Sequence, residues 1–154
     1  MFVCYGNICR SPMAEFLMKD YVEKKGLKDL FFIKSSATSY EEVGNPVYPG
    51  TRRILNSLSI DCSKKYSEKL KASDYEKYDY FIGMDEQNRR TMIRQLDGDK
   101  ENKVSLILDY SKNPREVADP WYTGEFDLTY QDIMEGIECF FEFLKRNRLE
   151  LRGL

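Results

Sequence analysis

Short apolar runs alternate along this chain with longer segments in which apolar residues recur at helical spacing. The apolar runs predict four strands, at residues 1–3, 30–33, 78–84 and 104–108. The periodic segments predict helices at about 12–26, 51–58, 85–96 and 127–148, with a short helix near 67–72. Strands that alternate with helices favour a mostly parallel sheet that is covered by helices on both faces.

The ends of the predicted elements carry local signals. Ser11 is expected to cap the first helix and Pro12 to take its first position, while Asp85 is expected to cap the helix that follows it. Residues 35–50 are rich in Ser, Gly, Asn and Pro and predict a loop, and 109–126 form a second long connection. Long connections in compact domains are often functional. Ligands of such sheets bind beyond the carboxyl ends of the strands, which is where we expect a site.

Composition narrows the class of protein. With 154 residues, 42% of them hydrophobic and 32% charged, the chain is expected to form a single globular domain over 1–154. Its net charge of -2 gives no support for nucleic-acid binding. No apolar run is long enough to span a membrane and no secretion signal is visible, which favours a cytoplasmic protein with reduced thiols. The chain has no histidine, so acid–base chemistry would fall to Asp, Glu, Cys, Tyr or Lys.

The loop after the first predicted strand combines a thiol with groups that bind anions. Cys4 and Arg10 lie six positions apart, and a guanidinium can contact two oxygens of a tetrahedral anion. Gly6 permits a positive φ, and Asn7 tolerates left-handed backbone and can tie the loop internally. Backbone N–H groups, a helix N-terminus and an arginine favour a thiolate, and Ser11 can hydrogen-bond the Cys4 sulfur. These residues predict that Cys4 attacks the phosphorus of a bound phosphate.

An acid for the leaving group is expected in the later connection. Asp119 lies within residues 109–126, after the last predicted strand and at the same end of the sheet as Cys4. Because histidine is absent, a carboxyl group on a loop is the natural proton donor. The adjacent Trp121 and Tyr122 are placed to wall a cleft for a flat substrate. The residues by themselves therefore describe a cysteine-dependent phosphatase.

Three segments together resemble the low-molecular-weight protein tyrosine phosphatases: Val3–Glu15 with Cys-x5-Arg-Ser-Pro-Met-Ala-Glu, Met84–Asn88, and Asp119–Tyr122. The match in spacing and element order extends along nearly the whole chain. The resemblance implies a three-layer α/β fold, with a four-stranded parallel sheet flanked by helices and a phosphate-binding loop after the first strand. It also implies metal-free hydrolysis of protein phosphotyrosine through a phosphocysteine, with no cofactor.

By position, the resemblance makes Cys4 the nucleophile, Arg10 the phosphate clamp and Asp119 the general acid. The residues expected to bind phosphate or substrate are Tyr5, Gly6, Asn7, Ile8, Cys9, Ser11, Tyr40, Trp121 and Tyr122. In the family the second loop cysteine, here Cys9, can form a protective disulfide with the nucleophile on oxidation. A histidine that commonly supports the loop is absent, and the nearby segment is Lys64-Lys65-Tyr66. Expected partners are phosphotyrosine proteins and oxyanions such as phosphate, bound by a monomer.

Three other functions remain open. Protein arginine phosphatases share this fold and loop but tend to carry Thr where this chain has Ile8, and an apolar side chain there favours phenyl phosphates. A thiol-dependent arsenate reductase would need a further cysteine pair beyond the third strand, and residues 81–98 contain no cysteine. A non-catalytic phosphoprotein-binding module would have no need of Cys4, Arg10 and Asp119 together. The sequence favours phosphotyrosine hydrolysis over each of these.

Overall fold

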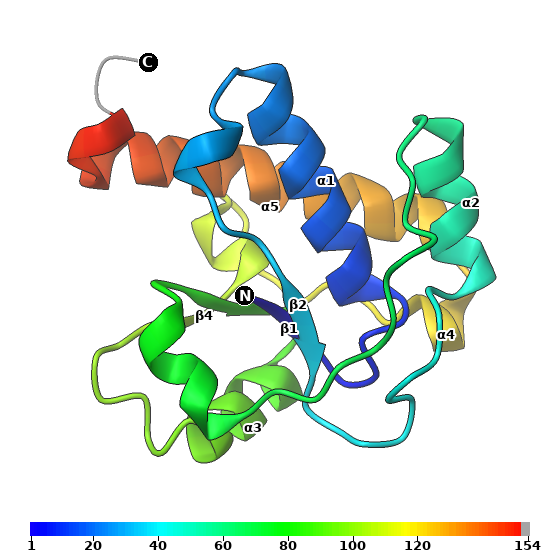
Figure 1. The fold of residues 1–154 in the computed structure, drawn as a ribbon, viewed down its shortest axis with the longest axis horizontal. Helices are drawn as coiled ribbons and strands as arrows, with labels where there is room; N and C mark the ends of the chain where they lie inside the picture. Colours follow the sequence, from blue (N-terminus) through cyan, green and yellow to red (C-terminus); the bar gives the residue numbers. More distant parts are fainter. Residues whose placement is uncertain (152–154) are drawn as a thin grey trace.

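The fold is built on a parallel sheet of four strands, in the order β2-β1-β3-β4 (Figure 1). This computed structural model describes residues 1–151. The strands are β1 (Phe2–Cys4), β2 (Ser35–Ala37), β3 (Phe81–Gly83) and β4 (Val104–Leu106). The predicted α/β class with a four-stranded parallel sheet is confirmed.

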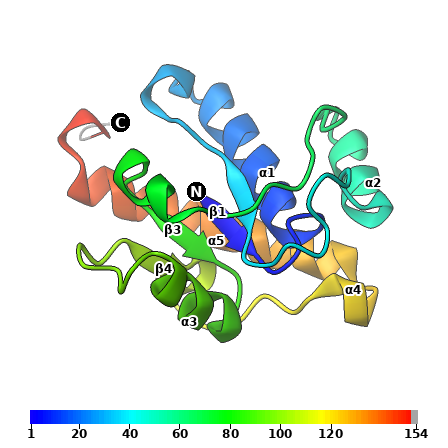
Figure 2. The same cartoon turned by 60° about the horizontal axis from the view of Figure 1, so that its bottom comes forward.

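Helices cover both faces of the sheet, which confirms the three-layer arrangement (Figure 2). The α-helices are α1 (Arg10–Lys24), α2 (Pro49–Ser57), α3 (Glu86–Gln95), α4 (Pro120–Thr123) and α5 (Phe126–Asn147). Short 3-10 helices are η1 (Lys28–Leu30), η2 (Ala72–Lys77), η3 (Ile107–Tyr110) and η4 (Leu149–Leu151). Helices α1, α2 and α5 lie together on one face, and α3 lies on the other. Among residues 1–151, no helix has the length and apolar character needed to cross a bilayer.

The strands bury side chains on both faces, which is why apolar runs predicted three of them. In β1, Phe2 and Cys4 belong to the core formed with α1 and α5. Val3, between them, packs on the opposite face in a cluster with Met92 and Leu96. The predicted strands at 78–84 and 104–108 contain the shorter observed strands β3 and β4, and the predicted strand at 1–3 is shifted by one residue from β1.

The second strand lies where a loop was predicted. Leu30–Ile33, the predicted strand, lies outside the sheet, and Phe32 is 66% exposed. Strand β2 falls instead within the predicted 35–50 loop and has small residues that pair with β1. The buried Ser35 hydroxyl has polar partners from distant residues, Asn7 and Glu15. No local pattern reveals such partners, so a short polar strand of this kind could not be recognised from the sequence.

Residues 67–72, predicted as a short helix, run extended beside β2 instead. The N–H of Ala37 donates to the carbonyl of Glu68 at 2.7 Å, and the N–H of Leu70 donates to the carbonyl of Ala37 at 2.8 Å. Helical structure begins only at Ala72, as the 3-10 helix η2. The carbonyl of Glu68 and the N–H of Leu70 are therefore satisfied by β2 rather than by a local turn.

The predicted start of the first helix is wrong by two residues. Helix α1 begins at Arg10 with Cys9 at its N-cap position, so Ser11 and Pro12 both lie in its first turn. No side chain caps this helix, and the Ser11 hydroxyl contacts groups of the loop instead. The predicted cap at Asp85 is confirmed, since its side chain accepts from an N–H in the first turn of α3.

Candidate active site

The loop between β1 and α1 turns its carbonyl groups outward. Five of them accept hydrogen bonds from segments outside the loop: those of Cys4, Tyr5, Gly6, Ile8 and Cys9. The backbone N–H of Asn7 points the other way, at the Cys4 Sγ, 3.3 Å from it. A loop that presents N–H groups to its hollow, next to the N-terminus of a helix, is an anion-binding site.

The predicted contact between Ser11 and the Cys4 sulfur is confirmed. The Ser11 Oγ lies 3.0 Å from the Cys4 Sγ and accepts a hydrogen bond from the Asn7 amide at 2.7 Å. Asn7 has the left-handed backbone that its residue type tolerates, with φ at 57°. Its second amide hydrogen bonds the Ser35 Oγ, at 2.9 Å. These bonds hold the loop closed around the sulfur.

Arg10 is buried, and its hydrogen bonds to protein groups come from Nη1. Its Nη1 donates to the Asp85 Oδ2 at 2.8 Å and to the Val117 carbonyl at 2.9 Å. Its Nη2 lies 3.5 Å from the Asp119 Oδ2. Burial alone would lower the pKa of Arg10, but the facing Cys4 and Asp85 outweigh it and raise that pKa above its usual value. The guanidinium is thus a permanent cation whose Nε and Nη2 edge suits two oxygens of a phosphate.

Asp119 reaches the same site from the connection after β4. It is the N-cap of α4, where its Oδ1 accepts from the Trp121 N–H at 3.0 Å. The other oxygen, Oδ2, is the one that approaches Arg10. The cap holds the carboxyl group in one orientation, with one oxygen free to exchange a proton with a leaving group. The predicted meeting of Cys4, Arg10 and Asp119 is therefore present in the structure.

A pocket of about 120 Å³ opens over the loop. Its lining consists of Cys4 to Arg10 together with Glu41, Glu42, Asp119, Trp121 and Tyr122. The Trp121 ring meets Tyr48 edge-on with 5.0 Å between centroids, and Tyr122 is 84% exposed. Tyr40, predicted as a wall, does not line this pocket; its ring faces the Lys69 ammonium at 5.1 Å.

The Tyr5 hydroxyl donates to the Glu41 Oε1 at 2.7 Å, so Glu41 and Tyr5 form the wall where Tyr40 was expected. Sequence reasoning missed Glu41, and it treated Asp85 only as a helix cap. A usable signal existed for Asp85, because it follows β3 at the carboxyl edge of the sheet.

Cys9 is buried close to Cys4. Burial, and then the neighbouring Cys4, raises the pKa of its thiol to about 12. Both cysteines are free thiols in the structure, and their pairing on oxidation stays a prediction. Within residues 1–151, no group of three or more His, Cys, Asp or Glu side chains is arranged to hold a metal ion.

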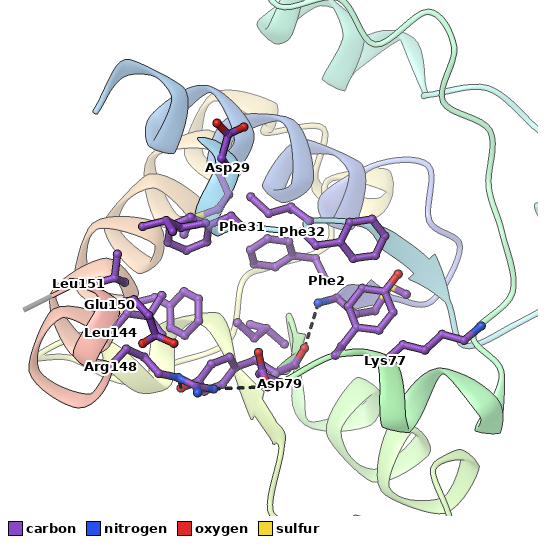
Figure 3. Close-up of a pocket in the computed structure, with 18 residues that line it drawn as sticks. Phe2, Asp29, Phe31, Phe32, Lys77, Asp79, Leu144, Arg148, Glu150 and Leu151 are labelled. Carbon is purple, nitrogen blue, oxygen red and sulfur yellow. Dashed lines mark hydrogen bonds and ion pairs between the residues drawn. The ribbon is translucent and has the colours of Figure 1, made fainter. Parts of the chain in front are cut away.

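A larger cavity, of about 430 Å³, lies at the other end of the sheet (Figure 3). It is lined by residues at the start of β1 and before β3, among them Phe2 and Tyr80, and by Phe140 and Leu144 of α5. Neither Cys4 nor Arg10 reaches it. The smaller pocket is the one that is lined by Cys4, Arg10 and Asp119.

Comparisons with known proteins agree with this geometry. A family model described as low molecular weight phosphotyrosine protein phosphatase matches residues 1–150. The low molecular weight protein-tyrosine-phosphatase YfkJ of Bacillus subtilis is 34% identical over 151 residues, which cover 96% of each chain. The crystal structure of YfkJ superposes with a TM-score of 0.91 at 32% identity, over 96% of this chain and 94% of that one.

Two other solved structures have a similar fold. The low molecular weight protein tyrosine phosphatase of Streptococcus pyogenes is 39% identical with a TM-score of 0.81, over 95% of this chain and 90% of that one. A Drosophila arginine phosphatase is 26% identical with a TM-score of 0.86, over 95% and 97% of the two chains. The match of the family model over nearly the whole chain shows that this protein belongs to the low-molecular-weight phosphotyrosine protein phosphatase family.

Proposed function

We propose that this enzyme hydrolyses phosphotyrosine in proteins, and small aryl phosphates, through a phosphocysteine and without a metal ion. The observation that carries the proposal is the meeting of three groups at one pocket. The Cys4 Sγ lies on its floor, the Arg10 guanidinium beside it, and the Asp119 Oδ2 3.5 Å from the Arg10 Nη2. A nucleophile, an oxyanion clamp and an acid are the three parts that a phosphate monoester requires.

In the first step the Cys4 thiolate attacks phosphorus and the P–O bond to the phenol breaks. The equatorial oxygens, which carry the charge of the transition state, are held by the loop N–H groups and by Nε and Nη2 of Arg10. Asp119 gives its proton to the departing phenolate oxygen. The products are the neutral phenol and a phosphate bound to the Cys4 sulfur.

In the second step water attacks the same phosphorus and the P–S bond breaks. The Asp119 carboxylate, left ionised by the first step, takes the proton from that water. The Cys4 thiolate is released, and the Asn7 N–H that donates to it stabilises it as a leaving group. The Ser11 hydroxyl, which accepts from the Cys4 thiol in the structure, can rotate to donate to the thiolate. Inorganic phosphate then leaves the loop.

The preference for phosphotyrosine rests on the walls of the pocket. The apolar Ile8 side chain lines it together with the rings of Trp121 and Tyr122. A phenyl ring can slide between such groups with its phosphate reaching the loop. The second candidate is a protein arginine phosphatase, which the likeness to the Drosophila enzyme keeps open. An apolar Ile8 leaves the polar guanidinium of a phosphoarginine without a partner at that position.

The test is hydrolysis of matched phosphotyrosine, phosphoserine and phosphoarginine peptides in the presence of a chelator, with Cys4→Ser as the control. We expect turnover of the phosphotyrosine peptide alone, and a phosphoenzyme trapped on Cys4 after rapid acid quenching. Faster release of phosphate from the phosphoarginine peptide would show that the enzyme is an arginine phosphatase instead. Unchanged turnover in Cys4→Ser, or a complete loss on adding the chelator, would refute the mechanism.

A further inference from the structure

The segment that carries Asp119 has few buried side chains to hold it in place. Among residues 118–125 only Pro120 is buried, and Trp121 is 52% exposed. Helix α4 has four residues, which is far shorter than a helix that its own hydrogen bonds can stabilise. The position of the Asp119 carboxyl group therefore depends on contacts between this segment and the rest of the protein.

One ring beside α2 contacts this part of the chain twice. Tyr48 directly precedes α2, and its ring meets the Trp121 ring edge-on, with 5.0 Å between centroids. The same ring stacks on Phe126, the first residue of α5, at 5.8 Å and an interplanar angle of 9°. Trp121 lies two residues after Asp119, and Phe126 is the next buried residue after Pro120. Tyr48 thus packs against the chain just after the carboxyl group and again where the chain returns to the core.

Tyr48 is itself attached to the loop between β1 and α1. Its backbone N–H donates to the carbonyl of Ile8 at 2.9 Å. In the first turn of α2, the Thr51 hydroxyl donates to the carbonyl of Cys9 at 3.0 Å. The N-terminus of α2 and the loop therefore form one hydrogen-bonded unit. Because Tyr48 belongs to this unit, its ring connects the loop to the segment of Asp119.

The start of α2 is shaped for aromatic packing and not for capping. Tyr48 occupies the N-cap position, where Ser, Thr, Asp or Asn would satisfy a free backbone N–H, and its side chain makes no cap hydrogen bond. Gly50 lies in the first turn although glycine is unfavourable in a helix. A Cβ at Gly50 would lie 2.5 Å from the Phe126 ring, so only glycine leaves that ring its place against α2.

The ion pair of Asp119 with Arg10 cannot hold the carboxyl group during the reaction proposed above. In the structure the Asp119 Oδ2 lies 3.5 Å from the Arg10 Nη2. When Asp119 acts as an acid, however, it carries a proton and is neutral, and Arg10 faces the phosphate. A contact that does not depend on charge is needed at that stage, and the packing of rings supplies it.

We propose that Tyr48 is a positioning residue: through its ring contact with Trp121 it holds the Asp119 carboxyl group where it can protonate the leaving group. The proposal rests on the function proposed above, because it assigns a support to the acid of that reaction. Tyr48 does not line the pocket and acts through its neighbour. The bond from the Trp121 N–H to the Asp119 Oδ1, at 3.0 Å, connects the position of the indole to that of the carboxyl group.

The ring contact can be measured without any substrate, because Trp121 is the only tryptophan of the chain. Tyr48→Leu keeps an apolar side chain and removes the ring, whereas Tyr48→Phe removes only the hydroxyl. We expect Tyr48→Leu to shift the emission of Trp121 to longer wavelength and to increase its quenching by acrylamide, and Tyr48→Phe to retain the wild-type values. Tyr21→Leu is the matched control, since it removes an edge-on ring contact of 5.5 Å with Phe141, between α1 and α5.

The second readout is kcat/KM for two esters that differ in their need for an acid. Phenyl phosphate has a poor leaving group that requires a proton, whereas p-nitrophenyl phosphate has a good one. We expect Tyr48→Leu to lower kcat/KM by about tenfold for phenyl phosphate and by about threefold or less for p-nitrophenyl phosphate. Both esters place an aromatic ring in the pocket, so weaker binding of the ring cancels in the ratio of the two values. Tyr48→Phe should recover most of the loss, and Tyr21→Leu should keep the wild-type ratio.

A third variant breaks the same contact from its exposed side, where folding is least affected. Trp121→Leu should change the ratio of the two esters in the same direction as Tyr48→Leu. Adding Tyr48→Leu to Trp121→Leu should then change the ratio by less than about twofold, because the contact is already absent. If Tyr48→Leu does not fold, a wild-type ratio in Trp121→Leu counts against the proposal and a lowered ratio supports it.

Three results would overturn the role of Tyr48: wild-type emission and quenching in Tyr48→Leu, equal losses for the two esters, or an effect of Tyr48→Leu that is undiminished when Trp121 is already leucine. The two proposals fail in different ways. A wild-type protein that hydrolyses neither ester would refute the proposed function. An active wild type whose ratio is unchanged in Tyr48→Leu would refute only the role of Tyr48.

Discussion

Removing the carboxylate of Asp85 should deprive the buried guanidinium of Arg10 of its nearer ionic partner and leave only Asp119, at 3.5 Å. The Asp85 Oδ2 lies 2.8 Å from the Arg10 Nη1, and the two side chains are 21% and 3% exposed. Breaking a fully buried pair costs about 3–5 kcal/mol. Because Asp85 is partly solvated, we expect Asp85→Asn to lose about 2 kcal/mol in the free energy of unfolding.

A second variant measures how much Asp85 contributes as the N-cap of α3. The Asp85 Oδ1 accepts from the Asn88 N–H at 2.8 Å, which caps α3. Asparagine can keep that cap, whereas alanine cannot, so Asp85→Ala should lose about 1 kcal/mol more than Asp85→Asn. The difference between the two variants measures the cap, and the loss in Asp85→Asn measures the ion pair.

Urea unfolding followed by circular dichroism gives both free energies, with unchanged m-values as the check that the unfolded states are comparable. An Asp85→Asn variant within about 0.5 kcal/mol of wild type would refute the reasoning, because it would show that the ion pair with Asp119 alone is enough to compensate the buried cation. A normal Asp85→Asn with a weakened Asp85→Ala would show that Asp85 matters for the helix and not for Arg10.

Three further outcomes are expected. Asp119→Ala should lower kcat for phenyl phosphate by about 10²–10⁴-fold, and should lower kcat for nitrophenyl phosphate by less. Inhibition by vanadate should be retained. Equal losses of kcat for the two esters would exclude a role of Asp119 as the acid. Gly50→Ala would place a Cβ 2.5 Å from the Phe126 ring, so we expect urea unfolding to show a free energy of unfolding lower by about 1–3 kcal/mol. An unchanged free energy would mean that the ring moves out of the way at no cost. Hydrogen bonds from Arg115 and then Ser111 lower the pKa of Glu135 to about 2, so the stability that they supply is present above about pH 4.3 and is lost as the pH falls toward 2. In Arg115→Met the melting temperature should therefore fall less between pH 4.3 and pH 2 than it does in the wild type. The same pH dependence in both proteins would contradict this.

Two elements with a local sequence signal were predicted well. The N-cap Asp85 and the apolar stripe of α5 depend on residues a few positions apart, and both are present as predicted. Strand β2 was missed for the opposite reason. Its polar residue Ser35 is buried because Asn7 and Glu15 satisfy its hydroxyl, and those partners are distant in the sequence. The apolar Phe32 was then assigned to a strand although it is largely exposed.

The residues of the site also fall into a predictable group and an unpredictable one. Cys4, Arg10 and Asp119 could be named from residue type, spacing and the rule that parallel strands end at one edge. The wall was not predictable in this way, since Tyr40 turns away from the pocket while the Glu41 next to it lines the opening. Adjacent loop residues point in different directions, and only the folded backbone decides which of them faces a ligand.

By itself, the sequence determined the class of fold, because strand–helix alternation restricts the topology. It also predicted the chemistry that we propose, because the residue types of a nucleophile, a clamp and an acid can be read directly from it. Only the tertiary structure decided what holds these groups in place. The ion pair of Lys65 with Glu15, and that of Arg10 with Asp85, join elements far apart in the chain. Buried charges interact strongly only when they lie within a few ångströms of each other. Which charged side chains come that close is decided by the packing of the elements and not by their separation in the sequence.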